Sequence, residues 1–125
     1  MAFEDEREAG VIRKVSNLSE METNNIICFL QGTVYSWCKN RKNEWFSMRD
    51  LMGGDNYFWQ GTPMIKLYNK HDPKMNGSEY AVSMAGKESG WLLKQVIKND
   101  KRQFKTMKSE LIRKYLWNGV ENNEE

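Results

Sequence analysis

Polar and apolar residues alternate with helical periodicity over the first long segment of the chain. Ser19 and Glu22 have the Ser-x-x-Glu spacing of a capping box, in which each side chain accepts a hydrogen bond from the other residue's amide. Apolar side chains then recur at three- and four-residue spacing from Ile26 to Trp37. This pattern predicts a helix over residues 20–40.

Two shorter helices are expected in the middle of the chain. Ser47 is a suitable N-cap, and Asp50 stands at the third position of the helix predicted over residues 48–52. A Thr-Pro pair at 62–63 predicts the start of another helix, because proline at the first helical position loses no hydrogen bond. The apolar face of this helix continues over residues 64–71.

The last third of the sequence predicts further helices. A short helix is expected over residues 79–84, after which Gly86 and Gly90 interrupt the pattern. A basic amphipathic helix is expected over residues 91–98. The periodic apolar residues of 104–115 predict a last helix, and the alternative is a hairpin centred near Lys108-Ser109.

The fold class is therefore predicted as mainly α, with α+β as the alternative, in a single small helical domain. The element order, with a short apolar element at Trp45-Phe46 after the first helix, resembles a winged-helix or helix-turn-helix DNA-binding domain. In such domains the second helix of the pair enters the major groove. The resemblance thus implies a recognition element over residues 62–70, with Lys66, Asn69 and Lys70 facing bases or phosphates.

Length and composition are consistent with one domain. A chain of 125 residues can bury a core, and its five tryptophans compensate for a hydrophobic content of only 39%. We expect a globular domain over residues 17–118, a disordered acidic segment over residues 1–16 and an acidic tail over residues 119–125. Because there is neither a signal sequence nor a long apolar run, we expect a cytoplasmic protein without a membrane partner.

The cysteines and the single histidine do not indicate a metal site. Cys28 and Cys38 lie in the first predicted helix, about 15 Å apart at the helical rise, which is too far for a disulfide. With one histidine and no zinc-type cysteine pair, we expect no metal and no cofactor.

No motif typical of an enzyme is found. His71 ends a predicted apolar helix face, where contacts with local carbonyls or with the helix dipole explain it. The Gly53-Gly54 loop lacks the other residues of a phosphate-binding loop, so a turn explains it better. An enzyme in which Asp55, Asp72 and Glu79 hold a metal ion is a third hypothesis, but these acids are scattered over predicted turns. We expect a non-enzymatic protein.

Positive charge is concentrated near the C-terminus. Residues 86–118 hold nine Lys or Arg against three acids, although the formal net charge of the chain is only +2. Clustered cations gain free energy by displacing counterions from phosphates. The first hypothesis is therefore a small nucleic-acid-binding module, with DNA as a more favoured partner than RNA. Its candidate contacts are Lys94, Lys98, Lys101, Arg102, Lys105 and Lys108.

Consecutive aromatic residues support an alternative. Tyr57, Phe58 and Trp59 cannot all face inward from a helix or a strand, so at least one ring is expected to be exposed. Exposed rings stack on bases or anchor protein partners. Tyr57 and Trp59 are therefore candidate contacts, and the second hypothesis is a protein-interaction or adaptor domain whose partner is another protein or a second copy of the chain.

Overall fold

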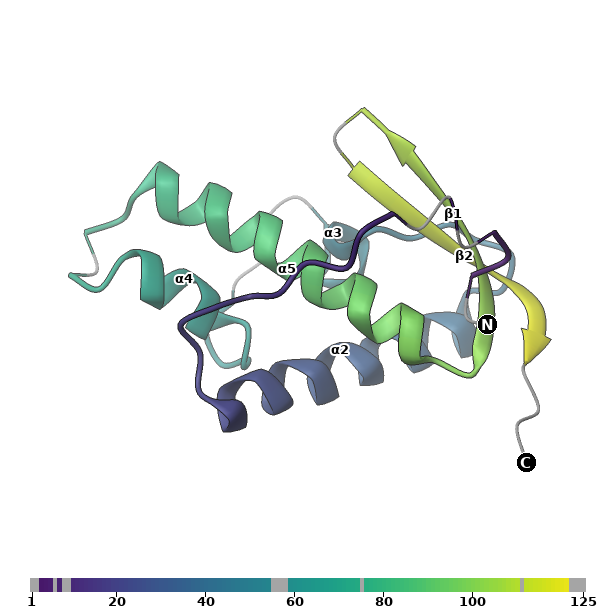
Figure 1. The fold of residues 1–125 in the computed structure, drawn as a ribbon, viewed down its shortest axis with the longest axis horizontal. Coiled ribbons are helices and arrows are strands. Elements are labelled where there is room, and N and C mark those ends of the chain that lie inside the picture. Colours follow the sequence, from purple (N-terminus) through teal and green to yellow (C-terminus); the bar gives the residue numbers. More distant parts are fainter. Residues whose placement is uncertain are drawn as a thin grey trace.

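The computed structural model describes residues 3–5, 7, 10–54, 59–74, 76–110 and 112–121. Within these residues, helices precede an antiparallel hairpin (Figure 1). The elements are α2 (Glu20–Asn40), α3 (Met48–Leu51), α4 (Ile65–His71), α5 (Glu79–Asn99), β1 (Arg102–Ser109) and β2 (Ile112–Glu121). The chain forms a small α+β domain, so the α+β alternative describes the fold class better than the mainly α one.

The predicted helix starts in the first half of the chain are confirmed. Ser19 Oγ accepts a hydrogen bond from the Glu22 amide at 3.0 Å, and Glu22 Oε1 accepts one from the Ser19 amide at 2.9 Å. Ser47 and Asp50 form the same reciprocal cap at the start of α3. These caps satisfy amides that have no partner inside the helix, which is why short local motifs were sufficient to predict them.

The predicted interruption at Gly86 and Gly90 is wrong. Both glycines lie inside α5, a continuous helix of 21 residues. One face of this helix is mainly apolar and buried, and it includes Ala85, Leu92 and Val96. Packing of that face against α2 and α4 outweighs the cost of about 1 kcal/mol for each glycine.

The helix predicted over residues 104–115 is also wrong, and the hairpin alternative is observed instead. The turn of this hairpin contains Glu110, slightly later in the chain than the predicted centre near Lys108-Ser109. Phe104 and Thr106 are buried whereas Lys105 and Met107 are exposed, which is the period of two that a strand requires. Pairing of Thr106 with Tyr115 establishes the antiparallel register.

Single residues from two distant segments extend the hairpin on either side. Phe46 exchanges two backbone hydrogen bonds with Tyr115, at 2.9 and 2.8 Å. Phe3 forms a parallel bridge with Phe104, whose carbonyl accepts from the Glu4 amide at 2.8 Å. The side chains of Phe3, Phe46, Phe104 and Tyr115 are buried together in the core. Aromatic packing therefore fixes the hairpin against the helices.

Residues 10–16, here called the N-terminal segment, run alongside α5 (Figure 1). Lys94 and Gln95 of α5 donate to the carbonyls of Val11 and Arg13, at 3.1 and 3.0 Å. The disorder predicted for residues 1–16 stays a prediction. The end of the predicted acidic tail, residues 122–125, lies outside the described residues.

The two cysteines differ in accessibility, which predicts different reactivity. Cys28 is exposed, whereas Cys38 is buried and burial raises the pKa of its thiol to about 11. At mildly alkaline pH we expect a thiol reagent to modify Cys28 at once and Cys38 only after unfolding, because the thiolate is the reactive species. The buried, neutral Cys38 thiol contributes to stability in full below the ordinary thiol pKa of 9.0. This contribution should be lost as the pH rises from there through about 11, because the thiol of the unfolded chain ionises first.

Reaction kinetics and thermal melts at several pH values test this expectation. A Cys28→Ser variant should abolish the fast reaction, while Cys38→Ala should retain it. Equal fast reaction of both thiols in the folded protein would contradict it.

Candidate nucleic-acid interface

The cations expected on α4 are only partly available. Lys66 is exposed and Asn69 is half-buried. Lys70 Nζ lies 2.7 Å from Glu88 Oε2 and also donates to the Ser16 carbonyl. The ammonium group of Lys70 is thus engaged inside the domain, so α4 presents one exposed cation rather than the row that the sequence suggested.

Glu88 organises a buried polar network that the sequence analysis missed. Its side chain is buried in α5, and its second oxygen, Oε1, lies 2.7 Å from His71 Nε2. The His71 ring also packs edge-on against Tyr80, with the ring centroids 5.9 Å apart. His71 therefore has a structural partner, although this partner is a carboxylate from α5 rather than the local carbonyls that we predicted. The position of Glu88 on the apolar face of α5 could have revealed this network from the sequence, because a buried carboxylate requires a partner.

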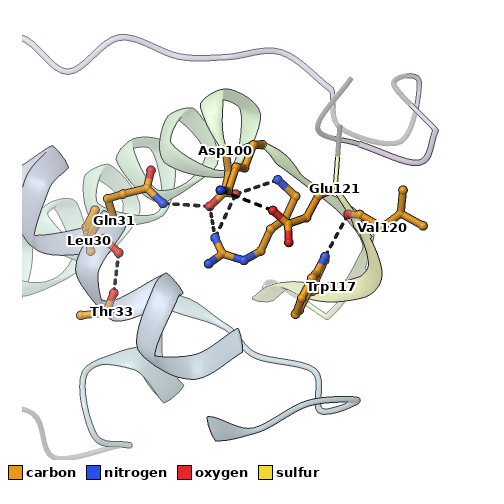
Figure 2. A network of polar contacts seen from close by, with 9 residues as sticks. Leu30, Gln31, Thr33, Asp100, Trp117, Val120 and Glu121 are labelled. Carbon is orange, nitrogen blue, oxygen red and sulfur yellow. Dashed lines mark hydrogen bonds and ion pairs between the residues drawn. The ribbon is translucent and has the colours of Figure 1, made fainter. Parts of the chain in front are cut away.

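Arg102 ties the hairpin to the helices, and Lys101 pairs with an acid of the hairpin itself. Arg102 Nη1 contacts both carboxylate oxygens of Asp100 at 3.0 Å, and its guanidinium carbon lies 4.2 Å from the ring centre of Tyr35. Figure 2 shows Gln31 of α2 reaching the same Asp100, at 2.8 Å. Lys101 Nζ lies 3.5 Å from Glu121 Oε1. These two cations are partly neutralised and are poor candidates for phosphate contacts.

The four remaining predicted lysines, Lys94, Lys98, Lys105 and Lys108, form no ion pair with any residue that the structure describes. They do not share one face. Lys108 lies on the same side of β1 as the buried Phe104, whereas Lys105 lies on the opposite side. The predicted basic face is thus divided between two sides of the hairpin.

Three cations from other parts of the chain act electrostatically on Lys94 of α5, and we call Arg13, Lys94, Lys108 and Arg113 the basic cluster. Burial lowers the pKa of Lys94, and repulsion from Arg113, Arg13 and Lys108 lowers this pKa further. The cross-strand pairing of Lys108 with Arg113 places two of these charges together near the hairpin turn. The charges that repel the Lys94 ammonium group therefore lie in the same region of the protein.

Neighbouring contacts orient the cluster. Lys94 Nζ donates to the Val11 carbonyl, and Arg113 Nη1 donates to Thr106 Oγ1 at 3.1 Å. The guanidinium carbon of Arg13 lies 5.7 Å from the ring centre of Trp91. Arg13 was not predicted as a contact because we expected its segment to be disordered. Arg113 was not predicted because only the register of the hairpin brings that residue to Lys108.

An open groove lies next to the basic cluster, between the N-terminal segment and the end of α5. It is lined by Ile12, Lys14, Gln95, Lys98 and Asn99. Lys98 stands one helical turn after Lys94, so their side chains are neighbours on α5. Lys14 and Lys98 therefore extend the positive surface of the cluster along the helix.

One of the two predicted aromatic contacts, Trp59, is buried. Trp59 belongs to the core and is only 8% exposed. Tyr57 lies outside the described residues, as does Asp55. The adaptor hypothesis stays a prediction, but the ring of Trp59 offers little surface to a partner.

Other candidate sites have structural explanations. Gly53 and Gly54 have φ values of 100° and 105°, as a turn requires. Asp72 accepts hydrogen bonds from the Tyr68 hydroxyl and from the amides of Asn76 and Gly77, so its carboxylate organises the loop after α4. Across the described ranges, no group of three or more His, Cys, Asp or Glu could hold a metal ion.

Comparisons do not assign this chain to a family. No protein-family model matches it, and neither a curated protein nor a solved structure matches it. In the part of the chain that the structure describes, no helix has the length and apolar character needed to cross a membrane. The charge and position of the basic cluster are therefore the features from which we infer a function.

Proposed function

We propose that this protein is a small nucleic-acid-binding module that contacts phosphates through the basic cluster and the lysines of the adjoining groove. The observation that carries this proposal is the gathering of positive charge around Lys94, whose Nζ has a neutral carbonyl as its acceptor and whose pKa is lowered by burial and by the charges of Arg113, Arg13 and Lys108. Gathered like charges disfavour the folded state, and a polyanion converts this repulsion into attraction. Release of counterions from the phosphates adds to the gain.

The proposal includes a winged-helix-like arrangement in which α5, rather than α4, faces the nucleic acid. Its support is the element order: Phe46, between α2 and α3, pairs with β2, and the hairpin follows α5 directly. Lys94 and Lys98 lie on the side of α5 that borders the groove. By contrast, α4 has seven residues, and its Lys70 is paired with Glu88.

Duplex DNA is the partner that this surface favours. The major groove of B-DNA, which is about 12 Å wide, admits either an α-helix or a two-stranded hairpin. Proteins that bind single strands use exposed aromatic rings on which bases stack. Trp59 is buried, and the guanidinium group of Arg13 lies over the Trp91 ring, so these two rings offer little stacking surface.

Fluorescence anisotropy with a short DNA duplex, and with one of its strands alone, tests this proposal. With six phosphate contacts, one for each cation of the basic cluster and each lysine of the groove, the slope of log K against log salt is expected to be about −5.4, which is about a 10³-fold loss of affinity between 50 and 200 mM salt. The duplex should bind more tightly than the single strand. Absence of binding at low salt would refute the proposal, and salt-tolerant association with a protein would favour the adaptor alternative.

A further inference from the structure

We propose that Asn99 reads an adenine base of duplex DNA, from the groove between the N-terminal segment and the end of α5. The ligand class is an A·T base pair that is approached through the major groove. This inference rests on the proposed function and deepens it, because it names the residue that would distinguish one DNA sequence from another.

The groove offers three kinds of side chain, and each suits a different part of a DNA duplex. Lys14 and Lys98 carry positive charge, and neither forms an ion pair with a residue that the structure describes. Gln95 and Asn99 carry amides, and Ile12 is apolar. Lysines that bind phosphates position a protein without reading sequence, whereas amides and apolar groups contact base edges. The groove is therefore equipped both to hold the DNA backbone and to read a base pair.

The side chain of Asn99 is available to a ligand. It is exposed, and its amide forms no hydrogen bond within the described part of the chain. An asparagine amide presents a donor and an acceptor side by side, and this pair matches N7 and the N6 amino group of adenine in the major groove. Guanine presents two acceptors at the same edge. Asn99 is thus expected to favour adenine over guanine.

Contacts beside Asn99 hold the end of α5 in position. Asp100, the next residue, is buried and accepts hydrogen bonds from Gln31 of α2 at 2.8 Å (Figure 2) and from Arg102 of β1 at 3.0 Å. The Asp100 amide donates to the Ile97 carbonyl at 3.1 Å. Asn99 therefore stands on a backbone that is tied to both the helices and the hairpin, and a site on such a rigid element is already organised before it binds.

Gln95 has a different part, because it holds the opposite wall of the groove to α5. Its Nε2 donates to the Arg13 carbonyl at 3.0 Å, between Ile12 and Lys14 in the chain. Val15 of the same segment packs against the core, whereas Ile12 lines the groove. Ile12 is thus placed to contact the methyl group of thymine, the base that pairs with adenine.

Selection from a pool of DNA duplexes with a random central region tests the inference, with the bound duplexes identified by sequencing. The natural protein should enrich an A·T pair at one position by about five- to hundredfold, the discrimination expected of one bidentate amide contact. Asn99→Ala should lose this enrichment. Replacing the selected adenine by 7-deazaadenine, which lacks the N7 acceptor, should weaken binding of the natural protein and leave binding of Asn99→Ala unchanged.

Lys14→Gln is the control from the same groove. It should weaken binding to all sequences alike and reduce the slope of log K against log salt by about 1, while the enrichment of A·T is retained. A thermal melt of each variant shows whether it is folded.

The outcomes separate this inference from the proposed function. If the natural protein binds duplexes without a base preference, or if Asn99→Ala keeps the preference, the reading of adenine by Asn99 is refuted and the nucleic-acid-binding proposal stands. Enrichment of a G·C pair that Asn99→Ala abolishes would also refute adenine as the base. If no duplex binds at low salt, both proposals fail.

Discussion

Simultaneous replacement of Lys94, Lys98 and Lys108 by glutamine is expected to lower the affinity for duplex DNA by on the order of 10²- to 10³-fold at 0.1 M salt. Each phosphate contact contributes about 0.9 to the slope of log K against log salt, so three lost contacts should reduce this slope by about 2.7. Lys101 is not included because it pairs with Glu121. Anisotropy titrations over a series of salt concentrations measure both quantities.

A charge-matched variant provides the control. Lys39, Lys42 and Lys74 are exposed and belong to neither the basic cluster nor the groove. Their replacement by glutamine changes the net charge equally, but it should alter the slope by less than one. If both triple variants lose affinity equally, overall charge rather than the proposed surface governs binding.

Replacement of Glu88 by alanine is expected to have the largest effect on stability, a loss of about 3–5 kcal/mol. Glu88 is the acid that contacts both Lys70 Nζ and His71 Nε2, and the carboxylate is buried between α4 and α5. Its removal leaves an ammonium group buried without its counter-charge. Urea unfolding monitored by circular dichroism measures the change in the free energy of unfolding.

Two further variants isolate the cause. Glu88→Gln preserves the volume of the side chain and one acceptor oxygen, so it should be less destabilising than alanine. Adding Lys70→Met to the alanine variant should recover part of the loss, because the unpaired ammonium is then removed. A loss below about 1 kcal/mol for Glu88→Ala would show that the network contributes little.

The surface that we propose for binding was only partly predictable. Lys94, Lys98 and Lys108 were identified from the imbalance of charge along the chain. Two other candidates, Lys70 and Arg102, are paired with buried acids, and a third, Lys101, is paired with the exposed Glu121. Asp100 is close enough in sequence to have suggested the second pair, whereas Glu88 is 18 residues from Lys70 and no local pattern links them.

The hairpin shows why the periodic pattern failed near the C-terminus. Phe104, Met107, Leu111 and Tyr115 have helical spacing, yet Met107 is exposed and the observed strands follow a period of two. Burial of Phe104 and Tyr115 with Phe3 and Phe46 stabilises the strands. These contacts join residues that are far apart in the sequence, and so tertiary packing outweighed local preference.

The sequence by itself determined where α2 and α3 begin, because N-caps act within one turn of the backbone. The Thr-Pro pair located α4 only approximately, since that helix begins at Ile65, two residues after Pro63. The sequence also determined the concentration of cations in the last third of the chain. Only the tertiary structure decided which cations are neutralised and which approach one another. The basic cluster combines the N-terminal segment, α5 and both strands of the hairpin, and such a combination depends on packing and strand register rather than on any local run of residues.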